Sequence, residues 1–189
     1  MHERINLNNM LLSAIFSALG ILVPVLFHLV GLGSMFLPMY LPLAVGAYLL
    51  SGRNALMLGV FTPLMSAFIT GMPPIYPPVA FMMSIQLGTF CLLISFFQHQ
   101  LKLPVLVTLL IAMAVDRAIL VAAYYLIAPL FSINVGIASA YDIIKSFPGI
   151  ILMCLIVPVA VPRFIRLIDR NSLRPYEHKN EKENGTHGS

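Results

Sequence analysis

The run MLLSAIFSALGILVPVLFHLV, residues 10–30, decides the class of fold, because it contains no acidic, lysine or arginine side chain. An uninterrupted apolar run of about 20 residues is long enough to span the hydrocarbon core of a bilayer as a helix. No small-x-small cleavage site follows it, so we do not interpret it as a cleaved signal peptide. The run predicts the first of several transmembrane helices.

The remainder of the 189-residue chain has the same character: 59% of its residues are hydrophobic and 10% are charged. Soluble domains carry about 25% charged residues, so this chain has too few charges to cover a water-facing surface. Arg53 is the only charged residue between Arg4 and Lys102. We expect an all-α integral membrane domain over residues 1–169. The polar tail, residues 170–189, is expected to be disordered and cytoplasmic, and its mixed charges form no nucleic-acid-binding patch.

Apolar runs and the breaks between them predict a bundle of transmembrane helices, because a lipid-exposed backbone must satisfy its own hydrogen bonds. A barrel would need alternating polarity, which the runs do not show. Six helices are predicted, at about residues 8–30, 34–50, 54–70, 78–97, 104–130 and 137–161.

Basic residues predict how this bundle is oriented. Arg4, Arg53 and Lys102 lie before the first helix and in two of the connections, and a group of arginines beginning at Arg163 follows the last helix. The other three connections contain no lysine or arginine. Because basic loops stay in the cytoplasm, both termini are predicted to be cytoplasmic and the three uncharged connections to be outside.

One outer connection lies within TGMPPIYPPVAF, residues 70–81, where four prolines and a glycine separate two apolar runs. Proline fixes the backbone angle φ and prevents the helix from continuing, so the connection is predicted to be stiff. Tyr76 lies at its centre. We interpret the segment as a lid over a binding pocket.

Four charged residues fall within the predicted helices: Asp116 and Arg117 near the middle of the fifth, and Asp142 and Lys145 near the outer start of the sixth. A charge in this position costs roughly 2.5–3.5 kcal/mol on insertion scales. Asp142 and Lys145 are three residues apart and can share a helix face. Two explanations remain open: the four charges pair with one another and hold two helices together, or some of them face a ligand.

Several polar side chains are predicted at the same outer level, which favours a pocket that opens outward. The candidate substrate-binding residues are His28, Tyr40, Tyr76, Gln86, Arg117, Tyr124, Tyr141, Asp142 and Lys145. The ligand class stays open at this point. The cationic side chains suit a carboxylate or phosphate, and Asp142 suits an amine. The tyrosines suit a planar ring, and the neighbouring methionines suit a hydrophobic cofactor. His28 with those methionines leaves a metal-bearing ligand as a further alternative.

Recognisable catalytic or cofactor chemistry is missing from the sequence. It contains no glycine-rich phosphate-binding motif and no histidine and cysteine cluster of the kind that binds a metal. Neither carboxylate of the apolar runs has the second carboxylate that acid–base catalysis would need. We therefore predict no catalytic residues, no metal, no cofactor and no enzyme activity. A small bundle without an energy-coupling device needs partner subunits to do work.

The first helix carries Ala14 and Ala18, a small-x-x-x-small pair that lets another helix approach closely. With this pair, the predicted size and topology, and the segment GVFTPLMSAFITGMPPIYPP (residues 59–78), the chain resembles the S components of energy-coupling factor transporters. These are the substrate-binding subunits of bacterial vitamin and micronutrient importers. The resemblance covers roughly residues 8–165.

The resemblance implies a mechanism and a set of partners. A vitamin or other micronutrient would bind in the outer pocket, with the loops at residues 28–34 and 71–78 closing over it. Ala14 and Ala18 would dock on a transmembrane T component that works with two ATPase subunits in the bacterial plasma membrane. A non-transporting membrane scaffold of similar size is the alternative, and a small intramembrane enzyme is a third.

Overall fold

The computed structural model describes the backbone of residues 2–29, 31, 37–74, 79–127 and 144–185, and the side chains of residues 9–29, 31, 37–74, 79–123, 125 and 144–167. Every regular element in these ranges is helical. The elements are α1 (His2–Leu29), α2 (Tyr40–Leu49), α3 (Gly52–Thr70), α4 (Val79–Phe96) with its π-helical extension η1 (Phe97–Leu101), α5 (Val105–Ile127) and α7 (Phe147–Gly185).

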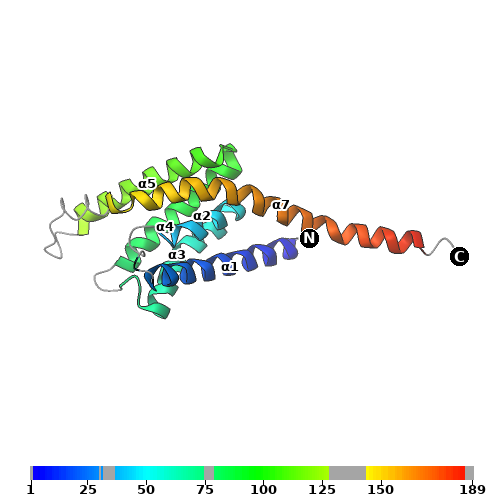
Figure 1. Cartoon of the computed structure of the whole chain (residues 1–189), viewed down its shortest axis with the longest axis horizontal. Helices are drawn as coiled ribbons and strands as arrows, with labels where there is room; N and C mark the ends of the chain where they lie inside the picture. The colour runs from blue at the N-terminus through cyan, green and yellow to red at the C-terminus, as the bar shows by residue number, and fades with distance from the viewer. Residues whose placement is uncertain (1, 30, 32–36, 75–78, 128–143, 186–189) are drawn as a thin grey trace.

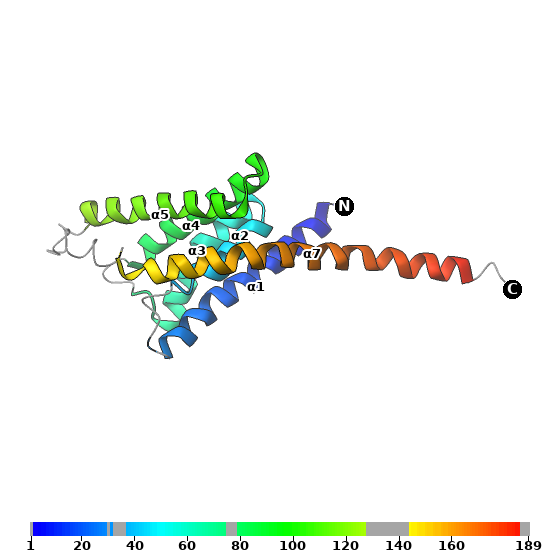
Figure 2. The same ribbon diagram turned by 45° about the horizontal axis from the view of Figure 1, so that its top comes forward.

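The helices run alternately in opposite directions and form an elongated bundle (Figures 1 and 2). Helices α1, α3 and α5 end, and α4 and α7 begin, toward one end of the bundle, which we call the loop end. Helix α2 begins deeper in the bundle, where Tyr40 packs against Phe90 in the middle of α4. At the opposite end, which we call the tail end, short connections lead from α2 into α3 and from η1 into α5. The last turns of α7 project away from the bundle beyond the tail end (Figure 1).

Four of the described segments are long and apolar enough to cross a membrane: Asn9–Leu29, Val79–Leu101, Val105–Ala123 and Phe147–Leu167. Half of the α4 segment is buried, against 11% for α1 and 17% for α7, which makes α4 the central helix of the four. Helix α2 has only 10 residues, and α3 carries the polar Arg53 and Asn54 in its first turn, so neither is among the four.

Helix α3 packs most extensively against α4, and two glycines allow this close approach. A Cβ atom on Gly59 would overlap the backbone carbonyl oxygen of Leu87 and would lie 2.8 Å from the Cα of Gly88. A Cβ atom on Gly88 would lie 2.6 Å from a methyl group of Val60. The α3–α4 interface is therefore a contact between backbones, which is the small-residue packing typical of membrane helices.

The tail end is held by side chains that bond to backbone carbonyls. Ser95 donates a hydrogen bond to the carbonyl of Leu50 over 2.7 Å, and the Nε2 atom of His99 lies 3.1 Å from the same oxygen. The hydroxyl of Tyr48 donates to the carbonyl of Val105 over 2.7 Å. These bonds tie α2 to α4, η1 and the start of α5.

Some helix boundaries differ from those predicted. The second helix was expected from residue 34, but residues 37–39 are not helical and α2 begins at Tyr40. Leu37 has a positive φ of 48°, which a helix cannot accommodate. The predicted ends at residues 34–36, 128–130 and 137–143 lie outside the described residues.

Helix α7 also continues well past the predicted boundary at residue 161 and reaches Gly185, through most of the segment expected to be a disordered tail. Glutamate, lysine and arginine are good helix formers, which gives this polar stretch a local preference for helix. The stretch lies away from the other helices (Figure 2).

Candidate functional site

Asp116, in the middle of α5, is the centre of a buried polar cluster at the level where α2 begins. Its side chain is 1% exposed, and both carboxylate oxygens accept hydrogen bonds. The Tyr40 hydroxyl donates to Oδ1 over 3.1 Å. The Nε and one terminal nitrogen of Arg117 donate to Oδ2 over 3.1 and 2.7 Å. A buried carboxylate is thereby paired with a cation and hydrogen-bonded, as burial of a charge requires.

Arg117 is the more open member of this ion pair, with 17% of its side chain exposed. Its other terminal nitrogen donates to the hydroxyl oxygen of Ser146 over 3.1 Å. The guanidinium carbon also lies 5.9 Å from the centroid of the Tyr40 ring, within the range of a cation–π contact. Arg117 therefore joins α5 to both α2 and the segment that leads into α7.

The ends of the helices explain why the cluster forms here. Tyr40 is the first residue of α2, and Ser146 immediately precedes α7. Both residues are buried, at 3% and 4% exposure. Because α2 and α7 begin at the level of Asp116 and α5 continues past it to Ile127, the cluster lies at the boundary between the packed bundle and the loop end.

Gln86, on α4, is buried near this boundary without full hydrogen bonding. It is 4% exposed, and within the described residues its amide nitrogen has no hydrogen-bond partner. Phe90, one turn further along α4, packs edge-to-face on Tyr40, with ring centroids 5.3 Å apart. Since residues four apart share a helix face, Gln86 lies on the face of α4 that is turned toward Tyr40, one turn nearer the loop end.

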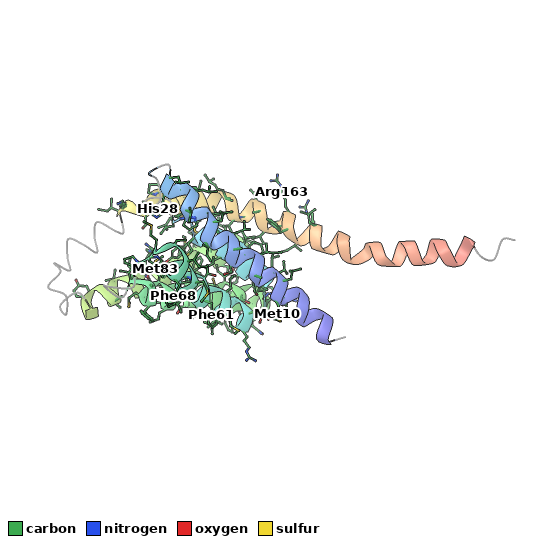
Figure 3. All side chains as sticks on the ribbon, turned by 90° about the horizontal axis from the view of Figure 1, so that it is seen from below. Met10, His28, Phe61, Phe68, Met83 and Arg163 are labelled. Carbon is green, nitrogen blue, oxygen red and sulfur yellow. The ribbon has the colours of Figure 1, made fainter. Side chains whose placement is uncertain are left out.

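The structure brings three predicted substrate-binding residues to this region: Tyr40, Gln86 and Arg117. His28 lies in the last turn of α1 and is exposed (Figure 3). Lys145 is half-buried next to Ser146 and has an interaction partner. Tyr76, Tyr141 and Asp142 lie outside the described residues, as does the side chain of Tyr124, which is on α5.

Sequence reasoning missed Ser146 and Phe90. A single serine or phenylalanine in an apolar run gives no signal on its own. The i, i+4 spacing of Gln86 and Phe90 on one helix was the only sequence feature that could have linked Phe90 to the site.

The predicted docking residues lie on a second surface. Ala14 and Ala18 are both exposed on α1, and large apolar side chains surround them on the same helix, including Leu11 at 63% and Leu22 at 54% exposure. Figure 3 shows α1 crossing the face of the bundle, with Met10 and His28 toward its opposite ends. A helix on this face could approach α1 closely at the two alanines.

The described parts of the chain contain no metal-binding cluster, because no three histidine, cysteine or acidic side chains lie together there. Cys91 is buried and Cys154 half-buried, and neither forms a disulfide within the same residues. In comparisons with known proteins, no family model, curated protein or solved structure matches the chain. The architecture that these observations establish is that of an all-helical chain with helices able to span a membrane.

Proposed function

We propose that this protein is a substrate-capture subunit of a membrane importer of the energy-coupling factor type. It binds a vitamin or other micronutrient at the loop end, which faces outward in the predicted orientation. It then docks on a transmembrane T component that works with two ATPase subunits. In this proposal the chain crosses the bacterial plasma membrane six times, with both termini in the cytoplasm.

The observation that carries the proposal is the buried group of charged and polar side chains at the level where α2 begins. Asp116, Arg117 and Tyr40 form one buried, hydrogen-bonded set, and Gln86 lies nearby with an amide nitrogen that lacks a partner among the described residues. Polar groups inside a membrane protein are expensive and mark substrate or ion sites by default. The exposed Ala14 and Ala18 add a surface on which a partner helix could dock.

A non-transporting membrane scaffold is the second candidate, and one observation favours it. Both oxygens of Asp116 accept hydrogen bonds from the protein, from Tyr40 and Arg117, so the ion pair could serve only to hold α2, α5 and α7 together. The unpaired amide of Gln86 supports the capture subunit, because it is a buried donor near the ion pair that a bound ligand would satisfy.

Purification in mild detergent separates the two candidates. The full-length protein is isolated, denatured by heat, and the released small molecules are identified by mass spectrometry. A capture subunit is expected to release one compound in an amount approaching that of the protein, whereas a scaffold releases only lipid and detergent. An unrelated membrane protein purified in parallel identifies compounds that bind non-specifically. Absence of a specific compound would contradict the proposed function.

A further inference from the structure

The amide of Gln86 requires an acceptor that the described protein does not provide. Its nitrogen is buried without a hydrogen-bond partner there, and a buried donor without an acceptor loses its hydration with no compensation. Gln86 also differs from the other polar side chains of α4. The hydroxyls of Ser84 and Thr89 bond to backbone carbonyls within the helix, at 2.8 Å each, and need nothing further.

Arg117 offers donors at the same site. A guanidinium has five N–H groups, and its three described bonds, to Asp116 and Ser146, use three of them. One N–H remains on each terminal nitrogen. Arg117 is also more open than Asp116, with 17% of its side chain exposed against 1%. A molecule that arrives at the cluster therefore meets the guanidinium and not the carboxylate.

Tyr40 places these donors close to each other. Its ring contacts Phe90 of α4 and lies beneath the guanidinium of Arg117, 5.9 Å from the guanidinium carbon. Gln86 lies one turn, about 6 Å, from Phe90 toward the loop end on the same helix face. Gln86 and Arg117 thus lie on two helices that both contact Tyr40, and both carry N–H groups.

We propose that the ligand of this site is a small molecule bearing a carboxylate, which accepts hydrogen bonds from Gln86 and Arg117 above the Tyr40 ring. The inference rests on the proposed capture function and names its substrate class. The donors that remain are N–H groups, so they recognise acceptor oxygens. The planar guanidinium matches the two oxygens of a carboxylate.

Charge distinguishes a carboxylate from the other ligand classes that the sequence left open. Arg117 is already paired with Asp116, so a dianionic phosphate would bring two further negative charges beside a buried carboxylate. A monoanion brings only one. A cationic amine would need acceptor atoms, but the Asp116 side chain is only 1% exposed and is already paired with Arg117.

The probe is the compound released by heat from the purified full-length protein, before and after treatment with trimethylsilyldiazomethane, which converts each carboxylic acid into its methyl ester. We expect the mass of the compound to rise by one methylene per carboxylate. A compound whose mass does not change, or one that carries phosphate or only an amine, would overturn the carboxylate inference and leave the capture function standing. No released compound would overturn both.

Gln86→Leu tests the role of the amide in that binding. The substitution removes a donor without a described protein partner, so the protein should unfold at an equal or higher temperature. The same protein should retain the compound roughly tenfold more weakly, because a hydrogen bond to a charged group is lost. Retention is measured as the amount of compound that remains after a fixed period of dialysis.

Gln98→Leu is the matched control, since Gln98 also has a buried amide atom without a described partner but lies on η1 at the tail end. This variant should retain the compound as the wild type does. Equal retention by wild type and Gln86→Leu would overturn the assignment of Gln86. Equal losses in both variants would show a general effect of the substitution and would also overturn the assignment of Gln86.

Arg117→Lys, which keeps the charge but not the planar guanidinium, should weaken retention of the compound while the protein stays folded.

Discussion

At the scale of the residue, Asp116 is the side chain whose replacement should affect the stability of the protein most. It combines the near-complete burial of its side chain with an ion pair to Arg117 and a hydrogen bond from Tyr40. Removing one member of a buried pair leaves the other charge uncompensated, and this costs more than the pair itself contributes.

We predict that Asp116→Asn lowers the free energy of unfolding by about 3–5 kcal/mol, because the Arg117 guanidinium loses its counter-ion. Tyr40→Phe removes only one hydrogen bond and should cost about 1–2 kcal/mol. Unfolding in mixed detergent micelles measures both. Thr89→Val, a change at a half-buried residue whose hydroxyl bonds only within its own helix, serves as the control. A loss for Asp116→Asn no larger than that of Tyr40→Phe would contradict the structural role of the pair.

Sequence alone could identify Asp116 and Arg117 as candidate site residues, because charged residues are rare in apolar helices. The sequence left two explanations open: the four charged residues of the predicted helices pair with one another, or some of them face a ligand. The described structure shows Asp116 paired with its neighbour Arg117. The contact with Ser146 could not be predicted, since periodicity assigns residues to helix faces and does not show which hydroxyl a flexible arginine reaches.

At the scale of the element, the apolar runs predicted the helices, and their predicted ends were close to those observed where glycine or proline interrupts the run. The predicted helices at residues 54–70 and 78–97 correspond closely to α3 (Gly52–Thr70) and α4 (Val79–Phe96). Gly71 and the prolines after it end α3 as expected, with Gly71 in the left-handed conformation at φ 71°. The start of α2 was wrong because local backbone geometry at Leu37, which is invisible in hydropathy, prevents an earlier start.

The close contact of α3 with α4 leads to a prediction about its glycines. Gly59→Ala should destabilise the protein by about 1–3 kcal/mol, because the new methyl group meets the backbone of Leu87 and Gly88, which cannot move without displacing α4. Gly52→Ala is the matched control: its new methyl group would lie 3.7 Å from a methyl group of Leu92, an ordinary contact. Gly52→Ala should therefore be neutral or slightly stabilising.

Unfolding of the two variants in the same detergent gives the comparison. Equal stabilities for Gly59→Ala and Gly52→Ala would mean that α3 and α4 do not approach as closely as described.

At the scale of the whole molecule, the bundle shows two different polar regions and exposes large apolar side chains on several helices. At the tail end, Ser95, His99 and Tyr48 bond to backbone carbonyls, whereas the buried ion pair of Asp116 and Arg117 lies at the level where α2 begins. Hydropathy predicted the helical membrane architecture but could not show that the two polar regions differ in this way.

The proposed docking face leads to the last prediction, which concerns Ala14 on α1. Ala14→Trp places a large ring where a partner helix must approach, so uptake of the compound by whole cells should fall to background. The purified variant should still release as much of the compound as the wild type, because Ala14 is exposed and does not contribute to the cluster around Asp116. Leu155→Trp, at a position 65% exposed on α7, controls for a tryptophan on a different apolar surface and should leave uptake unchanged. If uptake persisted in Ala14→Trp while the variant still bound the compound, α1 would not be the surface on which the partner docks.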